Sequence, residues 1–384
     1  MPASGHMRHP FDLSCIESGE DLIEFFNKIS KSLANHSLNA KVKIDGLNVS
    51  FKYVGGQFAV DRGSNKEIDI SGITIDRVEE RYGKGHGMLK AITNLLTILN
   101  SALPDIKQEI KDLGLIDNPH YFLNTEYVEG HTNVTSYSNS FIAFHGVNGF
   151  YAKYKKPTKK ELKLNPSLRP ELIRPGIEGG SGSVEVAYSQ DSLNSLVEKL
   201  KPHAQKIGFS VCGPVSAYCH KAIDLESVLD SALNFTTYSR ELERFKGKSI
   251  RHCLQLVQSK PSQYIVNRYN TFYQTREGKK ISPFNKSIYS EVIEHGMPIE
   301  SLVARQDLLE VTHGIILMHA TRLLGRQVLK SMTSSIGDLS NQSVSHEGIV
   351  IRDPKLSPYP FKLTGDFIVR GMSGLISQKI KASK

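Results

Sequence analysis

The residues AKVKIDGLNVSFKYV at positions 40–54 alternate between apolar and polar side chains. The apolar positions are even-numbered before Gly46 and odd-numbered after it. Alternation with a period of two is typical of β-strands, and the change of phase indicates two strands with a break between them. Gly55–Gly56 marks a turn, and the alternation resumes at Phe58 and Val60, which predicts a third strand.

Helical spacing flanks this strand region on both sides. Residues 18–35 place large apolar side chains three and four positions apart behind a serine that can cap a helix, and residues 88–103 repeat the spacing. Strand-like alternation returns at 121–128 and 140–154. Within the latter, Asn148–Gly149 predicts a tight hairpin turn.

The second half of the chain is mainly helical from about residue 190 to 333, and strand character returns at 348–351 and 360–363. Sheet segments on both sides of a helical block predict one α+β domain that carries an insertion. The predicted segments are the N-terminal part of the domain (8–155), a basic linker and mainly helical insertion (156–340), and the C-terminal part (341–384). Two consecutive domains are the alternative, but the last two strands would then lack partners.

Positive charge is concentrated in one stretch. The chain of 384 residues has a net charge of +9, and residues 151–175 contain eight lysines and arginines against two glutamates. Such a segment attracts polyanions, with phosphate backbones the leading candidate. The four prolines in the same stretch are equally consistent with a solvated linker, and both interpretations can hold.

The composition excludes several classes of protein. Hydrophobic residues make up 39% and charged residues 23%, which is typical of soluble globular proteins. The apolar runs are only a handful of residues long, so we expect no membrane-spanning segment. Four cysteines in the whole chain exclude a disulfide scaffold and predict a reducing, cytoplasmic environment.

Lys43 is the first candidate for catalysis. The alternation puts Lys41, Lys43 and Asp45 on the polar face of the first strand. A lysine amine becomes a nucleophile when neighbouring cations or desolvation favour its uncharged form, and Lys41 is such a neighbour. Gly46 allows a backbone or a ligand to come close. Lys-x-Asp-Gly is common by chance, so a solvated strand face that ends in a turn is the alternative.

Six segments, in the same order, resemble the motifs of the covalent nucleotidyltransferases, the superfamily of ATP-dependent DNA and RNA ligases and mRNA capping enzymes. The segments are Lys43–Gly46, Arg62–Ser64, Phe122–Val128, Phe141–Phe144, Glu347–Arg352 and Phe361–Leu363. The most specific feature is Glu-Gly-Ile-Val-Ile-Arg followed 15 positions after its glutamate by a strand lysine.

The resemblance implies a fold and a reaction. The fold is a nucleotidyltransferase (ligase adenylation) domain of antiparallel sheets with flanking helices. In the reaction, Lys43 attacks the α-phosphate of ATP and forms a lysyl-AMP intermediate. The AMP passes to a 5′-phosphate end, which a 3′-hydroxyl then attacks.

The resemblance also implies which residues hold the nucleotide. Lys362 offsets charge on the α-phosphate. Lys41, on the same strand face as Lys43, is added to the nucleotide-binding residues. Arg62 reaches the ribose or the phosphate at the 5′ end, and Glu126 accepts a hydrogen bond from a ribose hydroxyl. Phe144 stacks on the base.

Glu347 and Asp45 are the predicted ligands of a hydrated Mg²⁺ ion, which prefers oxygen donors. Two of the other assignments have alternatives in the sequence itself. Glu129 can take the role given to Glu126, and Phe144 can be an ordinary strand residue. The basic stretch and the helical insertion are the expected contacts for nucleic acid.

Three features depart from the family pattern. The last motif usually has two lysines one residue apart, but position 360 is a proline. The interval of 221 positions from Glu126 to Glu347 is unusually long. Only 22 residues follow Lys362, fewer than the roughly 70 that an OB-fold needs, so we expect no OB-fold. Several RNA ligases lack that domain, which favours an RNA-ligase-like enzyme.

We therefore expect an ATP-dependent polynucleotide ligase that uses Mg²⁺ and acts on nucleic-acid ends, with RNA slightly favoured over DNA. One alternative is a nucleotidyltransferase that modifies RNA ends or proteins without joining strands. Another is a degenerate family member that only binds nucleic acid. The proline at position 360, where the family usually has a second lysine, is the feature that supports this alternative. The sequence does not predict an oligomeric state.

Two weaker patterns remain. Cys212, Cys219–His220 and His252–Cys253 can form a zinc site on paper, but their spacing is unusual and packing as small hydrophobic residues is the favoured interpretation. Gly83–Gly87 precedes a helix and can cradle a phosphate, but it lacks the full phosphate-loop pattern. A plain loop is favoured there.

Overall fold

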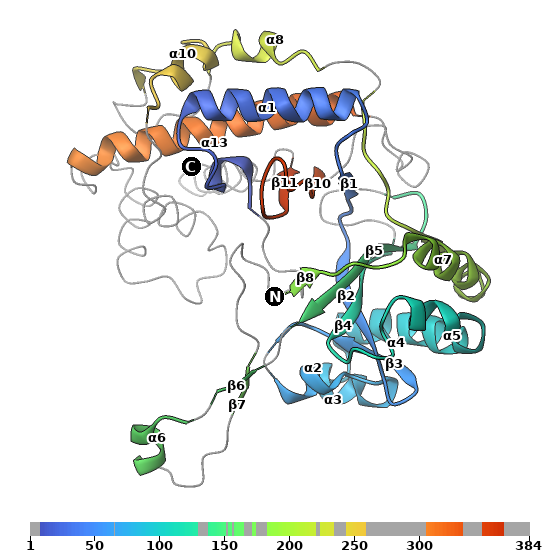
Figure 1. Cartoon of the computed structure of the whole chain (residues 1–384). Helices are drawn as coiled ribbons and strands as arrows, with labels where there is room; N and C mark the ends of the chain where they lie inside the picture. Colours follow the sequence, from blue (N-terminus) through green and yellow to red (C-terminus); the bar gives the residue numbers. More distant parts are fainter. Residues whose placement is uncertain are drawn as a thin grey trace, which may run out of the picture. The chain divides into compact units, whose positions relative to one another are not determined.

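The computed structural model of the chain is shown in Figure 1. It describes residues 8–64, 66–129, 137–150, 153–155, 157–164, 171–173, 183–219, 223–233, 243–258, 305–332 and 348–364. The chain forms two compact units. The described residues of the first unit lie between 41 and 216, and those of the second lie in 8–40, 217–332 and 348–364.

A mixed sheet forms the centre of the first unit (Figure 1). Its strands are β2 (Leu47–Val54), β3 (Gln57–Asp61), β4 (Tyr121–Val128), β5 (Phe141–Phe150), β8 (Ser183–Glu185) and β9 (Ser210–Cys212). The order is β3-β2-β4-β5-β8 with antiparallel neighbours, and β9 pairs in parallel with β5. The predicted turn between β2 and β3 is confirmed: Gly55 and Gly56 both have positive φ, a conformation that costs glycine little.

One face of this sheet is apolar and covered by helices. Val49, Thr125 and Phe144 lie side by side across β2, β4 and β5 on this face. The covering helices are α4 (Gly87–Ser101), α5 (Leu103–Asp112) and α7 (Gln190–Gln205). Their buried leucines and isoleucines form one hydrophobic cluster with the sheet. Burial of this apolar surface is the main stabilising contribution to the unit.

The opposite face of the sheet carries polar side chains. Asn48, Glu126 and Ala143 are in register across β2, β4 and β5, and Ser50 is in register with Asn124 one pair further along. We call this surface the polar face. Ser50, Asn124 and Glu126 are buried despite their polarity. Burial of polar groups costs free energy unless they form hydrogen bonds, so hydrophobic packing does not explain these residues. The polar face is therefore the candidate for a functional surface.

The predicted first strand is confirmed as β1 (Ala40–Lys43). In the first unit, the Val42 amide donates to the Val215 carbonyl over 2.8 Å, and Lys41 forms a bridge with Ser216. Three short helices follow β3, namely α2 (Glu67–Ser71), η2 (Ile75–Arg77) and α3 (Val78–Tyr82). They lead into α4 and bring the segment after β3 next to the start of that helix.

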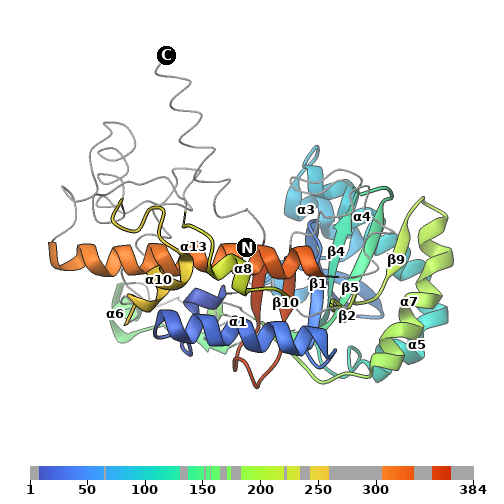
Figure 2. The same cartoon turned by 90° about the horizontal axis from the view of Figure 1, so that it is seen from above.

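The second unit is mainly helical and contains a strand pair. Its elements are η1 (Pro10–Asp12), α1 (Gly19–Ala34), α8 (Glu226–Leu229), α10 (Ile250–Gln255), α13 (Arg305–Ser331), β10 (Gly348–Ile351) and β11 (Phe361–Thr364). Figures 1 and 2 both show α1 and α13 side by side. Ser18 caps α1 in a capping box with Asp21, as predicted. The rings of Phe25 and Phe361 pack 5.2 Å apart and join α1 to β11.

Two features of the first unit differ from the sequence predictions. The predicted hairpin turn at Asn148–Gly149 is wrong, because β5 runs through both residues and pairs there with β4 and β8. We assigned residues 183–216 to the helical insertion from the sequence. In the structure they form strands β8 and β9 of this sheet and the covering helix α7. In the basic stretch, the structure describes the pair β6 (Lys153–Lys155) and β7 (Glu171–Ile173) and the helix α6 (Lys159–Leu164), with Lys159 and Lys163 exposed.

A search of the described helices finds none that is long and apolar enough to cross a membrane.

Candidate functional site

The polar face is organised around the side chain of Asn48. Its Nδ2 atom donates to Asn124 Oδ1 at 2.9 Å, to the Thr125 carbonyl at 3.3 Å and to Glu126 Oε2 at 3.2 Å. Glu126 is only 8% exposed, so this amide supplies much of what holds its carboxylate in place. The strand register explains the contact, because Asn48 and Glu126 are directly opposite each other on β2 and β4.

His145 reaches the same carboxylate from β5. Its Nε2 lies 3.6 Å from Glu126 Oε2. The register of β4 and β5 shifts at this point, so that Thr125 pairs with Phe144 and Asn124 pairs with Gly146. His145 is therefore an extra residue on β5, and such bulges commonly redirect a side chain near a site. His145 could not be identified from the sequence, because this bulge leaves no signature there.

Two buried atoms of the polar face have no hydrogen-bond partner among the residues that the structure describes. They are Asn48 Oδ1 and Ser50 Oγ. Ser50 is completely buried. Because buried polar atoms are nearly always paired, this face has unused capacity for a polar ligand or for water.

Gly46 brings the segment of Lys43 against this face. A Cβ atom at position 46 would lie 2.6 Å from the Tyr127 carbonyl oxygen and 2.9 Å from Glu126 Cγ. Only glycine allows this approach, as the sequence analysis expected. The turn that follows Lys43 therefore lies directly beside Glu126.

The residues around that turn are held by a second contact. The Asp45 amide donates to the hydroxyl of the buried Tyr137 over 3.0 Å. Lys41, Lys43 and Asp45 are all partly exposed, whereas the intervening Val42 and Ile44 are buried. The first strand thus presents its two lysines away from the core, and Asp45, just after the strand, is partly exposed as well.

Arg62 is linked to the same residues. Its Nη1 donates to the backbone carbonyl of Asn48. Asn48 therefore contacts Arg62 through its backbone and Glu126 through its side chain. The structure brings together three of the predicted features, namely the turn after Lys43, Arg62 and Glu126.

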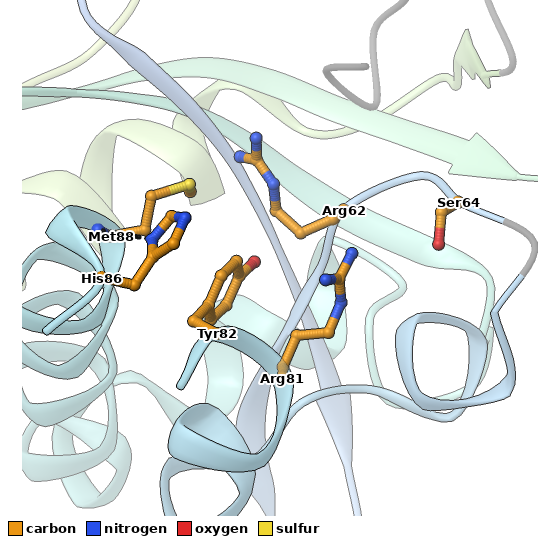
Figure 3. A pocket seen from close by; sticks show the side chains of 6 residues that line it. All are labelled: Arg62, Ser64, Arg81, Tyr82, His86 and Met88. Atoms are coloured by element: carbon orange, nitrogen blue, oxygen red, sulfur yellow. Dashed lines mark hydrogen bonds between the residues drawn. The ribbon is translucent and has the colours of Figure 1, made fainter. Parts of the chain in front are cut away.

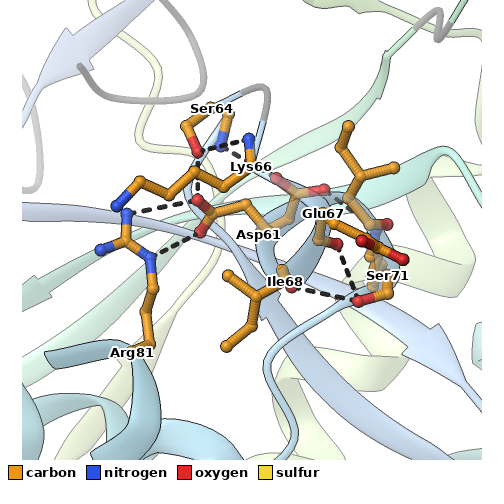
Figure 4. Close-up of polar contacts among 11 residues, drawn as sticks. Asp61, Ser64, Lys66, Glu67, Ile68, Ser71 and Arg81 are labelled. Carbon is orange, nitrogen blue, oxygen red and sulfur yellow. Dashed lines mark hydrogen bonds and ion pairs between the residues drawn. The ribbon is translucent and has the colours of Figure 1, made fainter. Parts of the chain in front are cut away.

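A buried ion pair supports the segment that carries Arg62. Lys52 Nζ lies 3.0 Å from Asp61 Oδ2, with 3% and 1% of their side chains exposed. The other Asp61 oxygen accepts a hydrogen bond from the Gly63 amide at 2.9 Å. Beyond it, Ser64 and Arg81, which are both labelled in Figure 4, donate to the carboxylate of Asp69. Neither ion pair was predicted: the pairing of Lys52 with Asp61 depends on the register of β2 and β3, and that of Arg81 with Asp69 on how α2 and α3 pack.

Phe144 is not part of the polar face. It is 1% exposed and lies in the hydrophobic cluster under the helices. The physical reason is the strand register: Glu126 is opposite Ala143, so Phe144 points to the other side of the sheet. The structure therefore does not bring Phe144 together with Glu126, and the aromatic ring near that carboxylate is the imidazole of His145.

The alternative carboxylate, Glu129, is engaged elsewhere. It accepts hydrogen bonds from Lys90 at 2.8 Å and from the Tyr127 hydroxyl at 3.0 Å. The bond from Lys90 lowers the pKa of Glu129, while burial and the bond to Glu129 raise the pKa of Tyr127 to about 12. These contacts tie Glu129 to α4, so Glu126 is the carboxylate that belongs to the polar face.

Lys362 belongs to the second unit. It lies on β11 opposite Val350, and its amide donates to the Arg8 carbonyl over 2.9 Å. Its side chain is partly exposed, whereas its neighbours Phe361 and Leu363 are buried. The alternation explains how a lysine can interrupt an apolar strand, because Lys362 lies on the face away from the core of this unit.

The structure describes only one of the two predicted magnesium ligands, Asp45. Glu347 lies outside the described residues. Within the described part of the chain, no group of three or more histidine, cysteine, aspartate or glutamate side chains is placed to hold a metal ion. The Asp45 carboxylate matches the oxygen preference of Mg²⁺, but one ligand does not make a site, and no step below passes through the ion.

The three cysteines of the possible zinc site, Cys212, Cys219 and Cys253, behave as small apolar residues. Cys219 and Cys253 are fully buried. Burial raises the pKa of Cys219 to about 11 and that of Cys212 to about 12. Such thiols are poor metal ligands and poor nucleophiles at neutral pH. Of the two histidines in this possible zinc site, His252 is exposed and His220 lies outside the described residues.

Comparison with known proteins finds partial similarity to DNA ligases. The DNA ligase of Francisella tularensis subsp. novicida (strain U112) is 29% identical over 132 residues, which are 34% of this chain and 17% of the ligase. The DNA ligase of Francisella philomiragia subsp. philomiragia gives the same values. The chain thus matches only 17% of the length of these relatives. No family model matches the chain, and no solved structure matches it.

Proposed function

We propose that the protein is an ATP-dependent polynucleotide ligase in which Lys43 bonds covalently to AMP before strands are joined. The observation that carries the proposal is the packing of Gly46 against Glu126, which holds the turn after Lys43 beside the polar face. The partial similarity to DNA ligases supports the same class of reaction.

In the proposed first step, the uncharged Lys43 amine attacks the α-phosphorus of ATP. The bond from that phosphorus to the bridging oxygen breaks, and pyrophosphate leaves with the electron pair. Lys41 stabilises the negative charge that develops on the phosphoryl oxygens, the role that the sequence resemblance also gives to Lys362. The attack uses the lone pair of the amine, so the amine gives up its proton to solvent before the new bond forms.

Glu126 and Arg62 position the nucleotide in this proposal. The Glu126 carboxylate is fixed by Asn48 and accepts a hydrogen bond from a ribose hydroxyl. The Arg62 guanidinium donates to ribose or phosphate oxygens. Mg²⁺, with Asp45 and Glu347 as the proposed ligands, supplies neutralising charge for the triphosphate when it is bound.

The two later steps transfer AMP and join the ends. An oxygen of the 5′-phosphate end attacks the phosphorus of the lysyl-AMP, and the amine of Lys43 leaves. A 3′-hydroxyl then attacks the activated end phosphate, and AMP leaves as the new phosphodiester forms. We propose RNA as the first substrate because of the Arg62–Gly63–Ser64 segment, and nicked DNA is the matched comparison because the relatives are DNA ligases.

Incubation with [α-³²P]ATP and Mg²⁺ tests the first step. We expect a labelled protein band in the wild type, loss of the label in Lys43→Ala, and retention in Lys107→Ala, which removes an exposed lysine on α5. EDTA added before the ATP should prevent labelling. A label of unchanged intensity in Lys43→Ala would exclude Lys43 as the nucleophile.

Sealing assays separate this function from the alternatives. A nucleotidyltransferase that does not join strands would form the labelled protein but leave nicked duplexes and single-stranded RNA unsealed. A degenerate, binding-only protein would bind nucleic acid with a strong dependence on salt and form no adduct.

A further inference from the structure

A cavity of about 390 Å³ lies beside the segment that follows β3. It is lined by Arg62, Ser64, Arg81, Tyr82, His86 and Met88 (Figure 3). These residues come from the segment after β3, from α3 and from the start of α4, all within the first unit. The volume is in the range of small-molecule sites and exceeds what a single phosphate group needs.

The cavity has a net positive charge. Arg81 is neutralised by Asp69, because Nε and Nη2 each donate to one carboxylate oxygen at 3.2 Å. Arg62 forms no ion pair with any described residue, and its only hydrogen bond there goes to the neutral carbonyl of Asn48. The charge of Arg62 is therefore available to an anion.

The hydroxyl of Tyr82 is an unused donor. It is buried and has no hydrogen-bond partner within the described ranges. Figure 3 shows it directed to the space between Arg62 and Arg81. Leaving a buried hydroxyl unpaired costs free energy, so a ligand oxygen at this position would be stabilised by a hydrogen bond from Tyr82.

His86 adds a second neutral donor. Its Nδ1 accepts a hydrogen bond from the Met88 amide at 3.2 Å as the N-cap of α4. In the neutral imidazole the proton is then on Nε2, which is a donor. The ring also lies 5.5 Å from that of Tyr82 with an interplanar angle of 42°, and Met88 adds an apolar surface.

We propose that this cavity binds the 5′-phosphorylated terminal nucleotide of the strand to be joined. Arg62, Tyr82 and His86 offer donors and no carboxylate, which matches a phosphate group with its acceptor oxygens. The remaining volume and the Tyr82–His86 aromatic wall fit the attached nucleoside. Arg62 connects the cavity through Asn48 to Glu126. The identification of the ligand as a strand end rests on the proposed ligase function.

Fluorescence anisotropy with the full chain tests the proposal. The probes are two labelled oligonucleotides of one sequence, with a 5′-phosphate or with a 5′-hydroxyl. We expect the wild type to prefer the phosphorylated probe about tenfold, and Tyr82→Phe to lose most of that preference, because one hydrogen bond to a charged group contributes on this scale. Tyr121→Phe, a change outside the cavity lining, is the control and should keep the preference.

A thermal melt accompanies each variant. Tyr82→Phe removes a hydroxyl that has no partner in the described structure, so its melting temperature should not fall. Loss of the phosphate preference with an unchanged melting temperature supports a binding role. An unchanged preference in both Tyr82→Phe and His86→Gln would overturn the proposal, as would equal competition by free AMP and by the unlabelled phosphorylated strand.

The adduct assay distinguishes this proposal from the proposed function. We expect Tyr82→Phe to form the ATP-dependent adduct at Lys43 as the wild type does. If the wild type formed no adduct but Tyr82→Phe still lost the phosphate preference, the ligase function would fail and the phosphate site would stand. If the adduct formed and the preference were absent from the wild type, the cavity assignment alone would be wrong.

Discussion

The side-chain amide of Asn48 donates a hydrogen bond to the carboxylate of Glu126 across the β2–β4 pair, with 3.2 Å between Nδ2 and Oε2. The backbone carbonyl of Asn48 accepts a hydrogen bond from Arg62. One residue thus joins the carboxylate proposed for the ribose to the guanidinium that lines the neighbouring cavity.

Replacement of Asn48 tests this link. Asn48→Asp keeps the size of the side chain but removes its donors and places a second negative charge beside Glu126. We expect the variant to lose about 2 kcal/mol in its free energy of unfolding and to form less adduct with ATP. Urea denaturation and the labelling assay measure the two effects. Full stability and full labelling would show that Asn48 does not hold Glu126.

Gly46→Ala tests the close approach of the Lys43 turn to Glu126. The new methyl group would lie 2.6 Å from the Tyr127 carbonyl oxygen, so we expect a loss of about 1–3 kcal/mol and reduced adduct formation. Gly87→Ala is the matched control, because nothing lies within 4 Å of its Cβ position and the residue is in the first turn of α4. It should be neutral or stabilise slightly. Equal behaviour of the two variants would contradict the account.

The buried pair of Lys52 and Asp61 should contribute to stability only as a pair. Lys52→Met leaves the Asp61 carboxylate buried without its cation, and we expect a loss of about 3–5 kcal/mol. Asp61→Asn in the same chain removes that charge and should recover part of the loss. A double-mutant cycle by urea denaturation measures the coupling. Additive losses would show that the two side chains do not interact.

His319 on α13 should make the second unit sensitive to acid. Burial, with a contribution from Arg322, lowers the pKa of His319 to about 4. The unfolded chain takes up a proton near pH 6.5, so stability is present above that pH and is lost as the pH falls from about 6.5 to about 4. The loss is at most about 3 kcal/mol, because the imidazole retains some exposure.

Melting temperatures of the wild type and of His319→Gln between pH 7.5 and pH 4 check this prediction. Other acidic groups contribute to both curves, so the difference between them isolates His319. The two curves should converge as the pH falls. Parallel curves would mean that His319 does not titrate in this range.

The sequence predicted elements whose period is long enough to recognise. The alternation through residues 40–54 and the helical stripe of α1 both appear in the structure. It did not predict β8 and β9, because three residues are too few to show a period. The turn predicted at Asn148–Gly149 failed because strands on both sides of β5 use those residues for pairing, a tertiary effect that a dipeptide does not contain.

The sequence identified residues of the site by their type. It did not predict which face of the sheet each side chain occupies. Lys43, Gly46 and Glu126 were identified from sequence, and the structure brings the turn after Lys43 to Glu126. Phe144 was assigned to base stacking, but the register places it in the hydrophobic core and puts His145 near the carboxylate. A single residue of slippage between strands reverses the face of every side chain beyond it, and sequence alone does not set that register.

The central claim is that Lys43 is the residue that bonds to AMP, and peptide mapping by mass spectrometry tests it most directly. The wild-type protein is incubated with ATP and Mg²⁺, digested, and analysed for a peptide that carries one AMP. We expect the modified peptide to contain Lys43, with the phosphoramidate at its Nζ atom. An AMP found on a different residue, or no AMP on any peptide of the folded wild-type protein, would contradict it.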